Sequence, residues 1–172
     1  MKSTPLTWTL LLIAGFAGCD TRDTRSREWQ VMAPERATAV EQSVRAFVAT
    51  VAHDVTQEGP IAWNKHFQDT PAFFMAVNGQ MAFPSGAAAK QGMPHVAQLI
   101  KRIDLKWGDD LRVDPLSPEL AMVGASWREV QTDPAGHSIE ETGYFTGLAQ
   151  SRDGRWQFRD AHWSSPVAPP TH

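Results

Sequence analysis

The order of hydrophobic patterns along the chain most strongly constrains its fold. In the first half, apolar residues recur at helical spacing. The clearest stripe is Val40, Val44, Phe47, Val48, Val51 and Val55. The second half predicts long strands over residues 104–114, 120–132, 137–150 and 155–164. Helices followed by strands predict an α+β domain whose helices cover one face of an antiparallel sheet.

Turn and capping residues predict where the shorter elements begin and end. Gly59-Pro60 ends the first long helix. Residues 73–77 predict a strand, and Asn78-Gly79 after it predicts a tight hairpin turn. Ser85 is a capping residue for a further helix, which Pro94 interrupts so that a second helical piece begins there.

The N-terminus reads as the export signal of a bacterial lipoprotein. Lys2 precedes an apolar run that ends at Cys19, the single cysteine of the chain. The run is shorter than the roughly 20 apolar residues of a membrane-spanning helix. Phe16-Ala17-Gly18-Cys19 resembles the lipobox, in which the thiol is acylated and becomes the new N-terminus. We therefore expect residues 1–18 to be a cleaved signal peptide and Cys19 to carry a lipid; a secreted protein with a free thiol is the alternative.

The segments on either side of the domain lack the patterns of folded structure. Residues 19–33 carry charges of both signs without an apolar period, which predicts a solvated tether. Residues 34–165 form the predicted domain, and the proline-rich residues 166–172 predict a flexible tail. Asp20 follows the lipidated cysteine, and the resemblance to enterobacterial lipoproteins implies retention at the inner membrane. We expect a lipid-anchored protein that faces the periplasm.

Composition and spacing argue against several classes of partner. The chain has 16 Lys and Arg against 19 Asp and Glu, so nucleic acid is not an expected partner. It has no glycine-rich phosphate loop of the familiar spacings, and we predict no cofactor. Its histidines occur singly rather than in pairs at ligand spacing, and we predict no metal.

The last third of the chain carries three recognisable motifs, which are Gly143-Tyr144-Phe145-Thr146-Gly147-Leu148, residues 153–158 and His162-Trp163-Ser164. In their order and spacing they resemble the SnoaL-like group of the nuclear-transport-factor-2-like superfamily, and the resemblance extends over residues 35–165. It implies a cone-shaped, curved antiparallel sheet with the N-terminal helices packed on its concave face around a pocket. Members use that pocket for catalysis, for ligand binding or only for assembly, so the fold leaves the function open.

The best catalytic candidates lie on the last two strands. Alternation places Asp160 and His162 on the same side of their strand. A type I turn with Gly154 in the left-handed position would set Thr146 opposite Asp160 and Tyr144 opposite His162. His162 held by Asp160 could then act as a general base, with Tyr144 donating to a developing negative charge. A structural histidine bonded to a nearby carboxylate is the alternative.

Aromatic residues suggest both a pocket wall and an assembly face. Trp127 and Trp163 are expected on the opposite face of the sheet with Phe145, where an exposed aromatic patch favours a homodimer. Coverage of that face by the chain's own loops is the alternative. The side chains expected to contact a pocket ligand are Trp63, Phe73, Thr146 and Trp156.

These inferences predict a membrane-tethered periplasmic domain that binds a small, mainly apolar molecule in its cone. One alternative is a cofactor-independent acid/base enzyme, either an isomerase, a dehydratase or a hydrolase. The other is a dimeric module for protein assembly.

Overall fold

The computed structural model describes residues 32–166. The predicted signal peptide, Cys19, most of the tether and residues 167–172 lie outside the described residues. None of the helices that the structure describes is long and apolar enough to span a bilayer. The elements follow in the order α1 (Pro34–Glu58), η1 (Pro60–Ala62), α2 (Trp63–His66), β1 (Phe74–Val77), β2 (Gln80–Phe83), α3 (Gly86–Leu99), β3 (Arg102–Trp107), β4 (Arg112–Ser117), β5 (Leu120–Thr132), β6 (Ser138–Arg152) and β7 (Arg155–Ser164).

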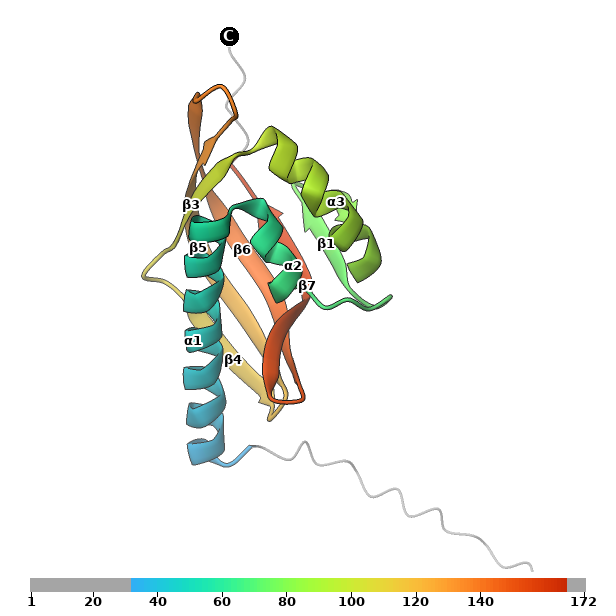
Figure 1. Ribbon diagram of the computed structural model, residues 1–172. Coiled ribbons are helices and arrows are strands. Elements are labelled where there is room, and N and C mark those ends of the chain that lie inside the picture. Colours follow the sequence, from blue (N-terminus) through green and yellow to red (C-terminus); the bar gives the residue numbers. More distant parts are fainter. Residues whose placement is uncertain (1–31, 167–172) are drawn as a thin grey trace, which may run out of the picture. The chain divides into compact units, whose positions relative to one another are not determined.

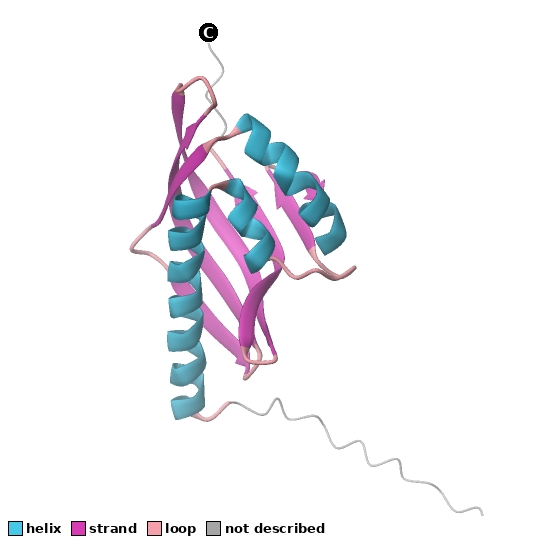
Figure 2. Cartoon of the chain, in the orientation of Figure 1, coloured by secondary structure: helices cyan, strands magenta, loops and turns pink. Residues whose placement is uncertain are grey.

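All the strands belong to one sheet, which the helices cover on one face. The strand order is β2-β1-β7-β6-β5-β3, and β4 also pairs with β5. Figure 1 shows α1 running along the sheet and α3 lying over the β1 end. Figure 2 shows the same separation of helices and strands into two layers. The domain is thus an α+β fold with helices packed on the inner face of a curved, open sheet.

Strand β1 makes the sheet mixed, because it runs parallel to β7. Phe74 pairs with Asp160, and Val77 pairs with Trp163. The predicted antiparallel sheet therefore contains one parallel pair of strands at this edge. Hydrophobic alternation records which face a residue occupies, but not the direction of a neighbouring strand.

The long helix α1 buries the predicted valine stripe. Its buried residues are Val40, Val44, Phe47, Val48, Val51 and Val55, which confirms the stripe. Helical spacing places these side chains on one face, and that face meets the inner face of the sheet. Gly59 follows the helix at φ 74°, a backbone conformation that glycine adopts readily, and the predicted end at Gly59-Pro60 is confirmed.

The capping and turn predictions in the middle of the chain are largely confirmed. The Ser85 hydroxyl accepts a hydrogen bond from the Ala88 backbone N–H (3.2 Å), as expected of a helix cap. Asn78 and Gly79 both have positive φ and join β1 to β2 in a two-residue hairpin. Pro94, however, does not divide the helix, because α3 runs without a break from Gly86 to Leu99.

The segment predicted as one strand over residues 104–114 is two strands, β3 and β4, which both pair with β5. The chain turns between them at Gly108, where an added Cβ would lie 2.0 Å from the Ser126 hydroxyl oxygen. Asp110 holds the turn against β5 by accepting hydrogen bonds from the backbone N–H (2.9 Å) and hydroxyl (2.7 Å) of Ser126. The division into β3 and β4 therefore depends on the contact between Asp110 and Ser126, which the local hydrophobic pattern cannot predict.

The predicted register between the last two strands is wrong. Asp153 and Gly154 both have positive φ, so the turn has two residues and Arg152 pairs with Arg155. A bulge between Leu148 and Ala149 then shifts the pairing. As a result, His162 lies opposite Thr146 rather than opposite Tyr144.

Gly86 at the start of α3 provides a test of the packing of this helix. Replacing glycine by alanine inside a helix ordinarily stabilises it by about 0.5–1 kcal/mol. At Gly86, however, the added Cβ would lie 2.1 Å from the Gln68 carbonyl oxygen and 2.6 Å from the Asp69 Cα. Because both contacts are with backbone, we expect Gly86→Ala to destabilise the protein by about 1–3 kcal/mol in urea unfolding.

The matched control is Gln91→Ala, at an exposed position of the same helix. This variant should stay within about 0.5 kcal/mol of the wild type. A Gly86→Ala protein at least as stable as the wild type would contradict the described contact between the helix and the preceding loop.

Candidate ligand-binding site

A cavity of about 410 Å³ lies between the helices, the β1–β2 hairpin and the inner face of the sheet. This volume is in the range of small-molecule sites. Most of the wall is apolar, and it draws on elements from every part of the described chain. The lining residues are Pro60, Trp63, Phe67, Met75, Val77, Asn78, Ala82, Phe83, Met93, Val96, Ile100, Ile103, Trp127, Glu129, Gln131, Glu141, Trp163 and Ser165.

Three tryptophans form one side of the cavity. Trp163 meets Trp63 edge-on, with ring centroids 5.5 Å apart, and meets Trp127 in the same manner at 5.2 Å. All three side chains are buried. Trp127, Trp163 and Phe145 share the sheet face opposite Tyr144 and His162, as predicted, but the helices cover that face, so the prediction of an exposed aromatic patch is wrong. Burial alternates along β5 and β6 with the odd-numbered residues inside, and Phe145 is also fully buried.

A small polar cluster interrupts the apolar wall at one end. Glu129 on β5 and Glu141 on β6 are cross-strand partners, so their side chains share a face. The Gln131 amide donates a hydrogen bond to the Glu129 carboxylate and makes a longer contact, 3.5 Å, with the Glu141 carboxylate. Glu129 is half-buried and Glu141 is exposed, which places the cluster at the rim of the cavity.

Burial raises the pKa of the Glu129 carboxyl, and the charge of Glu141 raises it further against the opposing hydrogen bond from Gln131. No lysine, arginine or histidine lines the cavity. The cavity thus combines an aromatic, apolar body with a carboxyl group that can exchange a proton closer to neutrality than an ordinary glutamate.

The predicted catalytic residues lie on the outer face of the sheet, away from this cavity. Tyr144 and His162 are exposed, and Asp160 is partly buried on the same side of β7 as His162. Burial raises the pKa of Asp160, and the nearby Arg159 opposes that shift. Among the described residues, no hydrogen bond joins Asp160, His162 and Tyr144. Their catalytic role stays a prediction.

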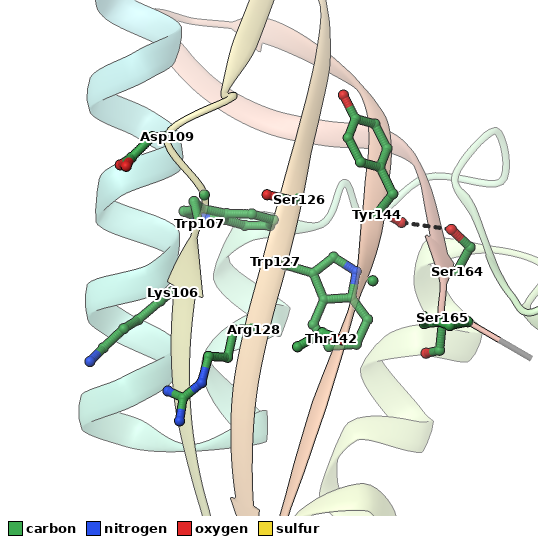
Figure 3. Close-up of a pocket in the computed structure, with 13 residues that line it drawn as sticks. Lys106, Trp107, Asp109, Ser126, Trp127, Arg128, Thr142, Tyr144, Ser164 and Ser165 are labelled. Atoms are coloured by element: carbon green, nitrogen blue, oxygen red, sulfur yellow. Dashed lines mark hydrogen bonds between the residues drawn. The ribbon is translucent and has the colours of Figure 1, made fainter. Parts of the chain in front are cut away.

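Tyr144 instead lines an open hollow of about 810 Å³ on the outer face. Figure 3 shows Tyr144 above Lys106 and Arg128, with Ser164 beside it. The Ser164 hydroxyl donates a hydrogen bond to the Tyr144 carbonyl oxygen at 3.0 Å. Arg128 is paired with Glu140, Nη2 to Oε2, at 2.6 Å. This hollow is open to solvent, and its lining mixes charged, hydroxyl and aromatic side chains.

Of the four predicted ligand contacts, the structure brings only Trp63 into the cavity wall. Phe73 is completely buried within the core. Trp156 packs against the core and donates its indole N–H to the Ser43 hydroxyl of α1 (2.9 Å). Thr146 is exposed on the outer face, opposite His162.

Sequence reasoning did not identify the rim cluster of Glu129, Gln131 and Glu141. A signal was present in the strand over residues 120–132. Its inward positions are apolar as far as Trp127, and the same alternation then continues into Glu129 and Gln131. Polar residues at inward-facing positions of a strand point to a cavity or to a rim that water reaches.

The buried His66 serves the helices rather than the cavity. Its Nε2 lies 3.1 Å from the Asp54 carboxylate of α1. Burial lowers the pKa of His66, and the Asp54 carboxylate opposes that shift. The described residues contain no cluster of three or more His, Cys, Asp or Glu side chains arranged to hold a metal ion. The pair therefore has a structural role between α1 and α2.

Comparison with known proteins identifies the class of fold. No family model and no curated protein matches the chain. A nuclear-transport-factor-2-like superfamily protein from Salmonella enterica serovar Typhimurium superimposes with a TM-score of 0.66 at 12% identity, over 77% of this chain and 95% of that one. A protein with a cystatin-like fold from Caulobacter vibrioides gives 0.58 at 16% identity, over 74% and 89%.

An enzyme is also among the similar structures. A hexachlorocyclohexane dehydrochlorinase superimposes with a TM-score of 0.60 at 13% identity, over 79% of this chain and 94% of that one. At these identities the comparisons speak for the fold alone. The domain has the cone-shaped α+β fold of nuclear-transport-factor-2-like and cystatin-like proteins, and this fold carries enzymes as well as proteins without an assigned activity.

The raised pKa of Glu129 predicts how stability depends on pH. Because the folded state disfavours the charged carboxylate, the wild type loses stability as pH rises through the ordinary glutamate range and through the pKa of folded Glu129. In the Glu129→Gln variant the side chain at position 129 cannot ionise, so this variant does not lose stability in the same way. We expect urea unfolding to show Glu129→Gln gaining stability relative to the wild type between about pH 4 and about pH 7.

Glu140→Gln is the matched control on the outer face. The hydrogen bond from Arg128 lowers the pKa of Glu140, so any pH dependence of this substitution has the opposite sign. A Glu129→Gln protein whose stability relative to the wild type is the same at both pH values would contradict the described burial of Glu129.

Proposed function

We propose that the domain binds a small, mainly apolar molecule in the cavity between the helices and the sheet. The mainly apolar cavity with one half-buried carboxyl group at its rim carries this proposal. Cavities of this kind, with few polar groups among aromatic and aliphatic walls, are typical of small-molecule sites. In this proposal the apolar wall provides most of the affinity, and the polar side chains of Glu129 and Gln131 fix the orientation of the bound molecule.

The sequence supports a location for this activity. We propose that Cys19 carries a lipid, that residues 19–33 hold the domain away from the membrane, and that the domain faces the periplasm. Asp20 favours the inner membrane in this proposal. A binding domain placed there would meet small molecules that enter or leave the cell.

A substitution that fills the cavity tests the proposal. Val96 lines the cavity from α3, and a phenylalanine there would occupy part of its volume. The probe is 4-phenylbutanol, a neutral molecule with a compact apolar body. When the free probe is at 100 times its Kd, we expect the wild type to gain about 2.7 kcal/mol of stability in thermal unfolding, and Val96→Phe to gain much less.

Leu99→Phe is the control, since Leu99 lies on the same helix but is 62% exposed and outside the cavity wall. It should respond to 4-phenylbutanol as the wild type does. Native mass spectrometry of the purified protein would identify a natural molecule that stays bound. Equal responses of the wild type and Val96→Phe would place binding elsewhere and contradict the proposal.

A metal-free acid/base enzyme is the second candidate function. The observation that favours it is the raised pKa of Glu129 beside an apolar cavity, because such a carboxyl holds its proton to a higher pH than an ordinary glutamate. The site would then support an isomerase, dehydratase or hydrolase reaction with Glu129 as the proton-transfer group. The outer residues His162, Asp160 and Tyr144 remain the alternative set for such a reaction.

We also propose that the domain forms a homodimer through the outer face of its sheet. The large side chains exposed there include Met122 at 42% and Tyr144 at 44%. Both project from the long strands β5 and β6, on the side away from the helices. Assembly through this face would leave the cavity open to its ligand.

A charge on the outer face tests the dimer. We expect Met122→Glu to shift the protein from dimer to monomer in size-exclusion chromatography with light scattering, because a buried unpaired charge opposes association. The control is Met81→Glu, at an exposed position on the edge strand β2, which should leave the dimer intact. A Met122→Glu protein with the mass of the wild type would contradict this interface.

A further inference from the structure

We propose that the molecule bound in the cavity is a hydrophobic amine, whose protonated nitrogen lies at the Glu129–Glu141 rim and whose apolar body lies among the tryptophans. This inference rests on the proposed binding function and specifies the chemistry of the occupant. It follows from two properties of the cavity: the sign of its charge and the nature of its walls.

The charge of the cavity has one sign. Glu129 and Glu141 are the two ionisable residues in its wall, and no basic side chain accompanies them. They face each other as cross-strand partners, an arrangement that is destabilising when both carry the same charge. The Gln131 amide bridges the two carboxylates but is neutral. A cation is therefore the group that the rim lacks.

Within the described part of the chain, neither glutamate has a salt-bridge partner. The basic residue next to Glu129 on β5 is Arg128, but its side chain pairs with Glu140 on the outer face of the sheet. The exposed ion pairs of the sheet thus leave the cavity rim uncompensated. An ammonium group at Glu129 would pair the half-buried carboxylate and would also reduce its repulsion with Glu141.

The walls suit the body of an organic cation. Trp63, Trp127 and Trp163 are all buried, and edge-on packing of Trp163 with each of the other two sets their rings at large angles to one another. Aromatic rings attract a cation near their faces and also pack against hydrocarbon. A neutral hydrocarbon would gain the second interaction but leave the carboxylates unpaired.

Trp127 links the aromatic wall to the carboxyl groups of the rim. It lines the cavity and is 5% exposed. Trp127 and Glu129 project from β5 on the same face, two residues apart. An ammonium group paired with Glu129 would therefore lie near the Trp127 ring, and attraction between a cation and an aromatic ring would add to the ion pair.

Three probes with the same apolar body and different head groups test the proposal. They are 4-phenylbutylamine, 4-phenylbutanol and 4-phenylbutanoate, which are cationic, neutral and anionic at neutral pH. Each is titrated into the full-length protein while tryptophan fluorescence is recorded, and the detergent is the same in all samples. We expect the amine to bind at least about tenfold more tightly than the alcohol, and the carboxylate to bind most weakly.

The variants assign the preference to the rim. Glu129→Gln should weaken binding of 4-phenylbutylamine to the level of 4-phenylbutanol, so that the preference for the amine is lost. Glu140→Gln changes the neighbouring residue of β6, which lies on the outer face, and should keep the wild-type preference. Glu141→Gln should reduce the preference partly. Circular dichroism of each variant checks that the fold is intact.

The outcomes separate this inference from the proposed function. Equal binding of the amine and the alcohol by the wild type would overturn the amine proposal and leave the proposed apolar site standing. A preference for the amine that survives in Glu129→Gln would also overturn it, because the cation would then lie elsewhere. Failure of all three probes to bind would overturn both.

Discussion

The packing of Trp163 connects most parts of this domain. Its ring lies against Trp63 from the helical layer, Trp107 from β3, Trp127 from β5 and Phe145 from β6, with centroid distances of 4.8 to 5.6 Å. Its backbone pairs with Val77 and accepts a hydrogen bond from the Asn78 N–H at 2.9 Å. One residue therefore joins the helices, the main sheet and the edge hairpin, and the cavity lies beside this junction.

The cavity depends on the two faces of the sheet having different chemistry. On the long strands β5 and β6, odd-numbered residues pack under the helices and even-numbered residues face outward. Beyond Trp127, the inward-facing residues of β5 change from apolar to the polar Glu129 and Gln131, which line the cavity. The outer face carries ion pairs and hydroxyl groups instead. The alternation of inward and outward side chains along β5 and β6 thus determines both the cavity wall and the outer surface of the sheet.

The sequence predicted the fold better than the site, for physical reasons that particular residues make clear. The valine stripe, the Ser85 cap and the strands over 120–132 and 155–164 are local patterns, and the structure confirms them. The pairing of β7 depends on a bulge, and the break at Gly108 depends on Ser126, so neither can be inferred from neighbours in sequence. Because of the bulge, Thr146 lies opposite His162. The prediction placed Trp127 on an exposed face, so it did not identify Trp127 as part of the cavity wall.

The parallel pairing of β1 with β7 has a consequence for the order in which the domain can form. The helices and the first hairpin leave the ribosome before the final strand exists, yet β1 completes its hydrogen bonds only when residues 160–163 arrive. Contacts between such distant segments form late, because a long loop must close first. The cavity, whose walls include both the hairpin and Trp163, therefore exists only in the finished chain, and a chain cut short before β7 would have no pocket to fill.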